Sequence, residues 1–385
     1  MFSFYSWEQR KLKELLSVPI NDGPHTTPKL IEEGIPFISV DAIVDNKIDF
    51  ERKRGFISEK TNEIYSRKYS PQFNDVYLVK SGSTVGKTAI VETNEQFNIW
   101  SPLAAMRTGE VSNPYFLYFL IQTDSVQNQV RGKSSNGTQP NLGMRELENF
   151  QIVVPRKKEQ IELGKFFKSL EHAITLHQRK LEKLKQLKKA YLQQLFPKPG
   201  ETVPKIRFAN FVGEWEERKL GEVADRFDNL RIPITASDRI SGDIPYYGAN
   251  GIQDYVEGFT HDGEFILVAE DGANDLKNYP VQYVSGRIWV NNHAHVLQGK
   301  KSIADNKFLM NAIKNFNIEP FLVGGGRAKL NADVMMKIVI KSPSHVEQQK
   351  IGTFFKQLDN ITTLHQSKLV KLKLIKQSLL QKMFI

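Results

Sequence analysis

One stretch of this sequence is written twice: residues Glu159–Phe196 read EQIELGKFFKSLEHAITLHQRKLEKLKQLKKAYLQQLF, and residues Glu347–Phe384 read EQQKIGTFFKQLDNITTLHQSKLVKLKLIKQSLLQKMF. The copies are 188 residues apart (347 − 159), and 20 of their 38 positions are identical without a gap. A second, shorter repeat is WEQRKL at Trp7–Leu12, which recurs as WEERKL at Trp215–Leu220. The chain therefore consists of two repeats, each with a globular body followed by a long basic segment.

Apolar residues recur every seven positions in each long segment, and a second series follows four positions later, which predicts a coiled-coil helix. His177 and His365 occupy the same place in the two copies, and we expect them to set the helix register rather than to bind a metal. The two series are Leu163, Leu170, His177, Leu184, Tyr191 with Phe167, Ile174, Leu181, Lys188, Leu195 in the first copy, and Ile351, Leu358, His365, Leu372, Leu379 with Phe355, Thr362, Leu369, Lys376, Met383 in the second.

Two such helices, each roughly 57 Å long at about 1.5 Å per residue, bury their seams most simply against each other. Near-identical surfaces that meet face to face are related by a twofold axis, which for two helices means an antiparallel pair. The predicted organisation is a first body at 1–152, a central spacer helix at 153–198, a second body at 199–340 and a C-terminal spacer helix at 341–385.

Both bodies are predicted to be of the mixed α/β (α+β) class, because short β-rich runs alternate with turn residues. Each body ends with a polar loop, a short helix capped by Asn141 or Asn331, and a strand, IVVP or IVIK. The predicted strands are Ile35–Val40, Asp75–Lys80 and Lys87–Val91 in the first body, and Glu264–Ala269, Val281–Ser285 and Arg287–Leu297 in the second.

The segment KSGSTVGKT, Lys80–Thr88, resembles a phosphate-binding loop. Such a loop needs four residues between its glycines so that backbone N–H groups can surround a phosphate. Only three residues separate Gly82 from Gly86 here. We therefore expect a turn between two strands, with a nucleotide site as the alternative.

Residues for catalysis are scarce in this chain, which has no cysteine. Asn113 before Pro114 suggests the base-gripping loop of adenine methyltransferases, but it fits a helix N-cap better. His293 and His295 share a strand face without a third metal ligand. Glu270 and Asp271 lack the further carboxylate and lysine of a nuclease. We expect the chain to perform no chemistry alone.

The formal net charge of +10 is concentrated in the long segments. Residues Arg156–Lys198 carry 12 basic and 4 acidic residues (+8), and Lys341–Ile385 carry 8 and 2 (+6), which leaves 10 − 14 = −4 for the rest. The net charge suggests a polyanionic partner. The alternative is that the lysines of the long segments merely solubilise an exposed coiled coil. No apolar run is long enough to span a bilayer, and MFSFYSWEQRKL lacks the order of a secretory signal, so a cytoplasmic protein is predicted.

The repeated GKFF/GTFF helices, the segment VPKIRFANFVGEWEERKLGEV, and the body elements LVKSGSTVGKTAIV and YYGANG with VAEDGAN together resemble the DNA-specificity subunit of type I restriction–modification systems. The resemblance covers essentially the whole chain. It implies two target-recognition domains that each read half of a bipartite double-stranded DNA site. It also implies helices that dock two modification (methyltransferase) subunits, and a complex with restriction (translocase/nuclease) subunits. S-adenosylmethionine, ATP and Mg would then be held by the partner subunits, with no cofactor on this chain.

This resemblance directs the choice of candidate site residues. Small, amide and basic side chains on glycine-rich loops can approach DNA closely, and tyrosine can fill the gap left by an opened base. The rival interpretations are a nucleotide-binding enzyme, a coiled-coil scaffold, and a DNA-binding regulator without enzymatic partners. The predicted DNA-binding residues are Ser81, Ser83, Thr84, Lys87, Gln139, Tyr246, Tyr247, Asn250, Asp271, Asn274, Arg327 and Lys329, and the predicted helix-seam residues are Leu170, His177, Leu184, Leu358, His365 and Leu372.

Overall fold

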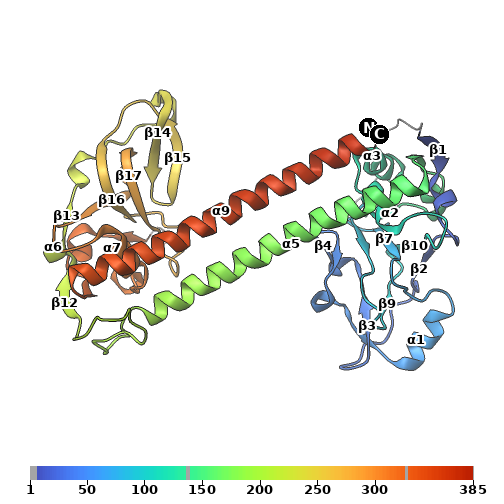
Figure 1. Cartoon of the computed structure of the whole chain (residues 1–385), viewed down its shortest axis with the longest axis horizontal. Helices are drawn as coiled ribbons and strands as arrows, with labels where there is room; N and C mark the ends of the chain where they lie inside the picture. Colours follow the sequence, from blue (N-terminus) through green and yellow to red (C-terminus); the bar gives the residue numbers. More distant parts are fainter. Residues whose placement is uncertain (1–6, 136–138, 326–327, 385) are drawn as a thin grey trace. The chain divides into compact units, whose positions relative to one another are not determined.

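The computed structural model describes residues 7–135, 139–325 and 328–384 (Figure 1). It divides into two compact units, the first formed by residues 1–177 with 368–385 and the second by residues 178–367. Each unit contains one globular body and one half of each long helix. No helix in the described ranges combines the length and apolar character that a bilayer span requires.

The two long segments form the helices α5 (Lys157–Gln194) and α9 (His345–Met383). In the first unit the beginning of α5 packs against the end of α9, where the rings of Phe167 and Phe384 lie 5.6 Å apart. In the second unit the chain beyond α5 meets the beginning of α9, where Phe196 and Phe355 lie 6.3 Å apart. The helices are therefore antiparallel, as their repeated seams predicted.

The predicted seam positions are all buried or half-buried, including Leu170, His177, Leu184, Leu358, His365 and Leu372. Two lysines interrupt the seam, and each is paired with an acid of the other helix. Lys188 Nζ lies 2.5 Å from Asp359 Oδ1, and Lys376 Nζ lies 2.5 Å from Glu171 Oε1. Because Lys376 and Asp359 follow Lys188 and Glu171 by 188 residues each (376 − 188 and 359 − 171), the repeat has copied the whole ion pair.

The first body contains two small sheets. The four strands of one follow the order β2-β10-β7-β8 and those of the other the order β6-β3-β9, and a separate hairpin pairs β4 with β5. All four side chains of β7 are buried. Two of them pack in a core cluster with α2, and the other two pack on the opposite face in a cluster with residues of β3 and β9. The bounds are β2 Asn21–Asp22, β3 Ile35–Ile38, β4 Ile43–Val44, β5 Lys47–Ile48, β6 Gly55–Ile57, α1 Glu59–Ser66, β7 Val76–Val79, β8 Thr88–Ile90, β9 Asn98–Ile99, β10 Leu103–Met106, α2 Pro114–Ile121, α3 Asp124–Lys133 and α4 Met144–Glu148.

The second body is built on one six-stranded sheet with the order β13-β18-β16-β17-β14-β15. Its core lies between this sheet and α7. The bounds are α6 Leu220–Val223, β13 Ala224–Arg226, β14 Ser241–Gly248, β15 Gly251–Val256, β16 His261–Ala269, β17 Val281–Val290, β18 Ala294–Gly299, α7 Asn306–Lys314, β19 Leu322–Val323, β20 Lys329–Leu330 and α8 Ala332–Met335. Short 3-10 turns in the two bodies are η1 Leu12–Leu15, η2 Val40–Ala42, η3 Phe50–Arg52, η4 Asp228–Leu230, η5 Ala236–Asp238 and η6 Glu319–Phe321.

Both bodies are joined to the helix pair in the same way. A strand that follows the repeated tryptophan pairs with the strand that leads into the long helix: β1 (Glu8–Lys11) with β11 (Gln151–Val154), and β12 (Glu216–Lys219) with β21 (Val339–Ser342). In each unit the tryptophan packs in a cluster with a phenylalanine of the body, one of a long helix and one that lies just after the end of the other long helix. The clusters are Trp7, Phe116, Phe167 and Phe384 in the first unit, and Trp215, Phe308, Phe355 and Phe196 in the second.

A repeated glycine lets each body touch its helix closely. A Cβ atom on Gly164 would lie 2.5 Å from Asn113 Oδ1, and one on Gly352 would lie 2.4 Å from Asp305 Oδ1. These two partners are the N-caps of α2 and α7, and each accepts a hydrogen bond from its helix backbone. The prediction that Asn113 is an N-cap followed by Pro114 is therefore confirmed.

The predicted cap Asn141 is wrong. Helix α4 begins at Met144 with Gly143 as its N-cap, because Asn141 lies in a bridge opposite Ser81. Asn331 does precede α8, but its side chain makes no capping hydrogen bond.

Candidate nucleic-acid interface

The segment Ser81–Lys87 forms the tip of a hairpin between β7 and β8, which pair antiparallel. Gly82 and Gly86 take positive φ angles of 101° and 96°, a conformation that glycine adopts without steric cost. A phosphate-binding loop leads into a helix whose N-terminus faces the anion. Here the chain enters β8 at Thr88 instead. The nucleotide-site alternative therefore lacks its structural basis.

The hairpin tip lies against the polar loop that precedes α4. Ser81 forms a bridge with Asn141, the Gly82 N–H donates to Pro140 O at 3.0 Å, and the Leu142 N–H donates to Lys80 O at 2.8 Å. The structure thus brings the predicted tip residues into one surface with the loop that contains Gln139. On this surface Ser83, Lys87 and Gln139 are exposed, and Ser81 and Thr84 are half-buried.

A buried ion pair anchors the base of this tip. Lys80 is almost fully buried, and its Nζ lies 3.3 Å from Asp22 Oδ2. Lys68 bonds the other oxygen of Asp22, and His25 Nε2 lies 3.3 Å from Asp22 Oδ2. Asp22, Lys68 and His25 could not be predicted as part of this site, because nothing in the sequence relates them to the KSGS segment.

The second body has a corresponding pair of loops. The Leu330 N–H donates to Glu270 O at 2.7 Å, and Asp271 forms a bridge with Lys329. Glu270 therefore occupies the backbone position that Lys80 occupies in the first body. Asn250 joins a third loop, since its Nδ2 donates to Gly272 O at 2.9 Å and its Oδ1 accepts from the Asn274 N–H at 3.0 Å. The predicted residues Asn250, Asp271, Asn274 and Lys329 are thus assembled on one surface.

The two predicted tyrosines do not share this exposure. Tyr246 is 1% exposed, its hydroxyl exchanges hydrogen bonds with the backbone of Ile234, and Arg239 stacks on its ring at 4.2 Å. It cannot fill a gap in a DNA duplex, and that prediction is corrected. Tyr247 is half-buried against the core cluster that Phe227 also contacts, and burial raises the pKa of its hydroxyl. Arg327 lies outside the described residues.

An ion network supports the second loop pair. Glu270 accepts from Arg231 at 2.7 Å and pairs with Lys329 at 3.0 Å. His295 Nδ1 lies 2.6 Å from Asp228 Oδ2, and its Nε2 lies 2.8 Å from Leu330 O. Burial alone would raise the pKa of the Asp228 and Glu270 carboxyls, but the neighbouring His295 and Arg231 hold both pKa values below their ordinary range.

Asp228, Glu270 and His295 could also be taken for a metal site, because their ligand atoms lie within 4.8 Å of one another. Both carboxylates, however, already have cationic partners in Arg231 and Lys329. The separate His293 contacts Asp271 through Nδ1 at 2.6 Å. The cluster is therefore an ion-pair network at the base of the loops, and the two histidines serve different partners.

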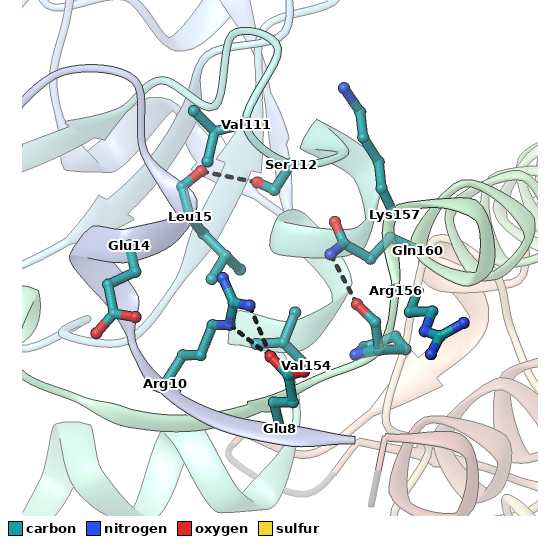
Figure 2. A pocket seen from close by; sticks show the side chains of 11 residues that line it. Glu8, Arg10, Glu14, Leu15, Val111, Ser112, Val154, Arg156, Lys157 and Gln160 are labelled. Atoms are coloured by element: carbon teal, nitrogen blue, oxygen red, sulfur yellow. Dashed lines mark hydrogen bonds and ion pairs between the residues drawn. The ribbon is translucent and has the colours of Figure 1, made fainter. Parts of the chain in front are cut away.

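A charged pocket of about 240 Å³ lies at the joint of the first unit (Figure 2). Arg10 pairs with Glu8 at 2.6 Å, the Ser112 hydroxyl donates to Leu15 O at 2.8 Å, and Gln160 Nε2 donates to Pro155 O at 3.0 Å. The Arg10–Glu8 pair lies within the exposed strand β1, whereas Ser112 and Gln160 bond backbone carbonyls inside the joint. The lining residues are Glu8, Arg10, Glu14, Leu15, Val111, Ser112, Val154, Pro155, Arg156, Lys157 and Gln160.

The long helices also carry apolar side chains away from their seam. Leu176 and Leu187 of α5, and Leu364 and Ile375 of α9, are between 39% and 58% exposed. Leu364 and Ile375 repeat the positions of Leu176 and Leu187 (364 − 176 and 375 − 187 are both 188). Residues eleven apart lie on one helix face, because eleven residues make about three turns. Each unit thus carries one exposed apolar residue of each long helix at repeat-related positions.

Known proteins resemble this chain in sequence and in fold. A type I restriction enzyme specificity subunit of Haemophilus influenzae is 48% identical over 151 residues, which are 39% of this chain and 38% of that protein. The MjaX specificity subunit of Methanocaldococcus jannaschii is 25% identical over 223 residues, which are 56% of this chain and 52% of that protein. The matched regions thus span about two fifths to half of these curated relatives.

Solved structures share the fold over nearly the whole chain. The S subunit of a type I restriction–modification system from M. genitalium superposes with a TM-score of 0.73 at 16% identity, covering 100% of this chain and 98% of that one. A second type I R-M chain, from a study of complex assembly and conformational transition, gives 0.53 at 15% identity and covers 98% and 97%.

The family model for the type I restriction modification DNA specificity domain matches the chain twice, at residues 5–186 and 213–374. These matches include both bodies with their loop pairs and most of both long helices. The two matches also repeat the internal duplication that the sequence displays. The chain therefore belongs to the type I restriction–modification DNA specificity family.

Proposed function

We propose that this chain reads a bipartite double-stranded DNA site in the cytoplasm and positions the modification and restriction subunits of a type I complex. One observation carries the proposal: both bodies use the same backbone frame to present loops of different chemistry. Leu142 N–H to Lys80 O and Leu330 N–H to Glu270 O are equivalent hydrogen bonds. The loops they hold read SGSTVGK in one body and DGANDLK in the other. A shared frame with different side chains suits two different half-sites.

The helices supply the assembly function in this proposal. Their exposed apolar positions Leu176, Leu187, Leu364 and Ile375 come in repeat-related pairs. Two equivalent surfaces on one chain suit two copies of one modification subunit. The catalytic groups, together with S-adenosylmethionine, ATP and Mg, would belong to the partner subunits, and lysines of the helices would contribute sequence-independent attraction to phosphates.

The test is methylation mapping in cells that express this chain with its modification subunit. Ser83→Ala with Lys87→Ala should relax or change the half-site read by the first body and leave the other half intact. Asn274→Ala with Lys329→Ala should do the reverse. All four residues are exposed, so each pair controls for the other. If either variant altered both half-sites, or if neither altered any, the loops would not be the reading surfaces.

A second measurement separates recognition from catalysis. The purified chain alone should transfer no methyl group from S-adenosylmethionine to DNA, and addition of the modification subunit should produce site-specific methylation. Methyl transfer by the chain alone would contradict the proposal. Binding of the modification subunit without any DNA selection would favour the scaffold interpretation instead.

A further inference from the structure

The second unit contains an open apolar groove of about 520 Å³ beside the end of α5. Its floor is formed by aromatic, proline and alanine side chains, and one wall is the beginning of β21. The lining residues are Gln193, Phe196, Pro197, Lys198, Pro199, Ala312, Asn315, Phe316, Asn317, Val339, Ile340 and Lys341.

In the first unit a helix occupies the corresponding place. Gln381 has the same repeat position as Gln193 of the groove (381 − 193 is 188). Its Oε1 accepts the Asp124 N–H, the first of helix α3, at 3.0 Å. Val126 and Val130 of α3 are each 1% exposed and belong to the core that includes Phe384, the repeat partner of Phe196. Helix α3 therefore covers the surface that is open in the second unit.

The same helix closes the outer edge of strand β11. Gln129 Nε2 donates to Gln151 O at 2.7 Å, and Gln129 Oε1 accepts from the Gln151 N–H at 2.9 Å. One side-chain amide thus satisfies both backbone groups of the first strand residue. An unpaired strand edge is a surface on which another chain can form hydrogen bonds.

Val339 occupies the place of Gln151 in the second unit. Gln151 lies opposite Lys11, and Val339 lies opposite Lys219. The adjacent Leu220 N–H donates to Ile338 O at 2.9 Å. In an antiparallel pair the backbone groups of successive residues point alternately toward and away from the partner strand, so the N–H and C=O of Val339 point away from β12. Within the described ranges no side chain is recorded as bonding them, and Val339 is 42% exposed.

The sequence explains why the second unit has no such helix. Asn113 and Asp305 cap equivalent helices 192 residues apart (305 − 113), which aligns Ile121 with Ile313. Leu142 follows Ile121 by 21 residues (142 − 121), but Leu330 follows Ile313 by only 17 residues (330 − 313). The shorter connection turns at Asn315 and enters η6 instead of forming a second helix.

We infer that an amphipathic helix of the modification subunit fills this groove and takes the place that α3 takes in the first unit. This inference rests on the proposed function. The helix should present two aliphatic residues four positions apart to Phe196 and Ala312, just as Val126 and Val130 of α3 join the core that includes Phe384 in the first unit. A side-chain amide should reach the edge at Val339. Lys198 and Lys341 line the groove, which has no acidic lining residue, so the helix should also carry carboxylates.

The first test measures binding of the purified modification subunit to the full chain. Val339→Arg places a long charged side chain across the groove and should weaken binding at least tenfold. Val18→Arg is the matched control, since Val18 is 41% exposed in the other unit, and it should bind as wild type does. Circular dichroism melting should show that both variants remain folded.

The second test uses the absence of cysteine from the chain. Asn317 is exposed at the groove, so a benzophenone attached to Asn317→Cys should cross-link a helical peptide of the modification subunit, and one attached to Val18→Cys should not. Cross-linking to a second copy of this chain, or unchanged binding by Val339→Arg with no cross-link, would overturn the inference. If the wild-type chain did not bind the modification subunit at all, the proposed function itself would fail.

Discussion

The joints between each body and the helix pair share their apolar part and differ in their polar part. Both contain a tryptophan that packs on two phenylalanines of a three-phenylalanine cluster, and both place a helix glycine against an N-cap. In the first joint, Trp7 Nε1 donates to Glu159 Oε1 at 3.2 Å. In the second, Glu347 accepts two hydrogen bonds from Arg207, both at 2.7 Å, and the buried Nε1 of Trp215 has no hydrogen-bond partner among the residues that the structure describes.

This difference shows which part of a joint the repeat constrains. Close packing of aromatic rings tolerates little change in volume, so the duplicated clusters stay alike. A carboxylate can be satisfied by any donor within reach, and the linker before the second body supplies Arg207. The glutamate at one repeat position therefore acts as an acceptor for indole in one unit and as a buried ion-pair partner in the other.

The largest expected effect tests the shared apolar part. Phe167→Ala and Phe355→Ala should each cost about 3–5 kcal/mol in the free energy of unfolding, because both side chains are fully buried at the same repeat position. Urea unfolding followed by hydrogen–deuterium exchange would assign each loss to its own unit. Phe166→Ala is the control, since Phe166 is 44% exposed, and it should cost less than about 1 kcal/mol. Unequal losses in the two core variants would break the equivalence of the joints.

A smaller effect should separate the two polar parts. Glu347→Gln should cost about 3 kcal/mol, because it leaves Arg207, whose side chain is 15% exposed, without its counter-charge. Glu159→Gln should cost less than about 1 kcal/mol, because a glutamine oxygen still accepts from the Trp7 indole. Chemical denaturation of both variants would measure the difference. Combining Glu347→Gln with Arg207→Met should recover part of the loss, and equal losses for the two glutamates would contradict the assigned roles.

The smallest effect is a loss of stability in acid, and it concerns the bases of the loops in the second body. Asp228 and Glu270 have carboxyl pKa values held below their ordinary 3.8 and 4.5 in the folded state, so the unfolded chain binds more protons in acid. Their contribution to stability is complete above about pH 4.5 and is lost as the pH falls through the lowered folded values. Exchange protection of the Lys329 and Leu330 amides should fall accordingly. Glu270→Gln should weaken this acid dependence, and an unchanged pH profile would remove Glu270 from the network.

The candidate site was only partly predictable. The hairpin tip with Ser83 and Lys87, and the loop surface with Asn274 and Lys329, follow from glycine-rich turns between β-rich runs. Tyr246 was misjudged because its burial depends on two neighbouring strands, β15 and β17, and on the distant Ile234. A local pattern carries no information about such contacts.

The sequence by itself determined the duplication, the helix seams and the antiparallel pairing, because a seven-residue apolar period and its exact repetition act through local geometry and symmetry. Only the tertiary structure decided that Lys80 pairs with Asp22 while Glu270 pairs with Arg231, and that α3 closes one strand edge while Val339 borders an open groove. Buried charges and strand edges must find partners wherever the folded chain places them, and those partners lie tens of residues away in sequence.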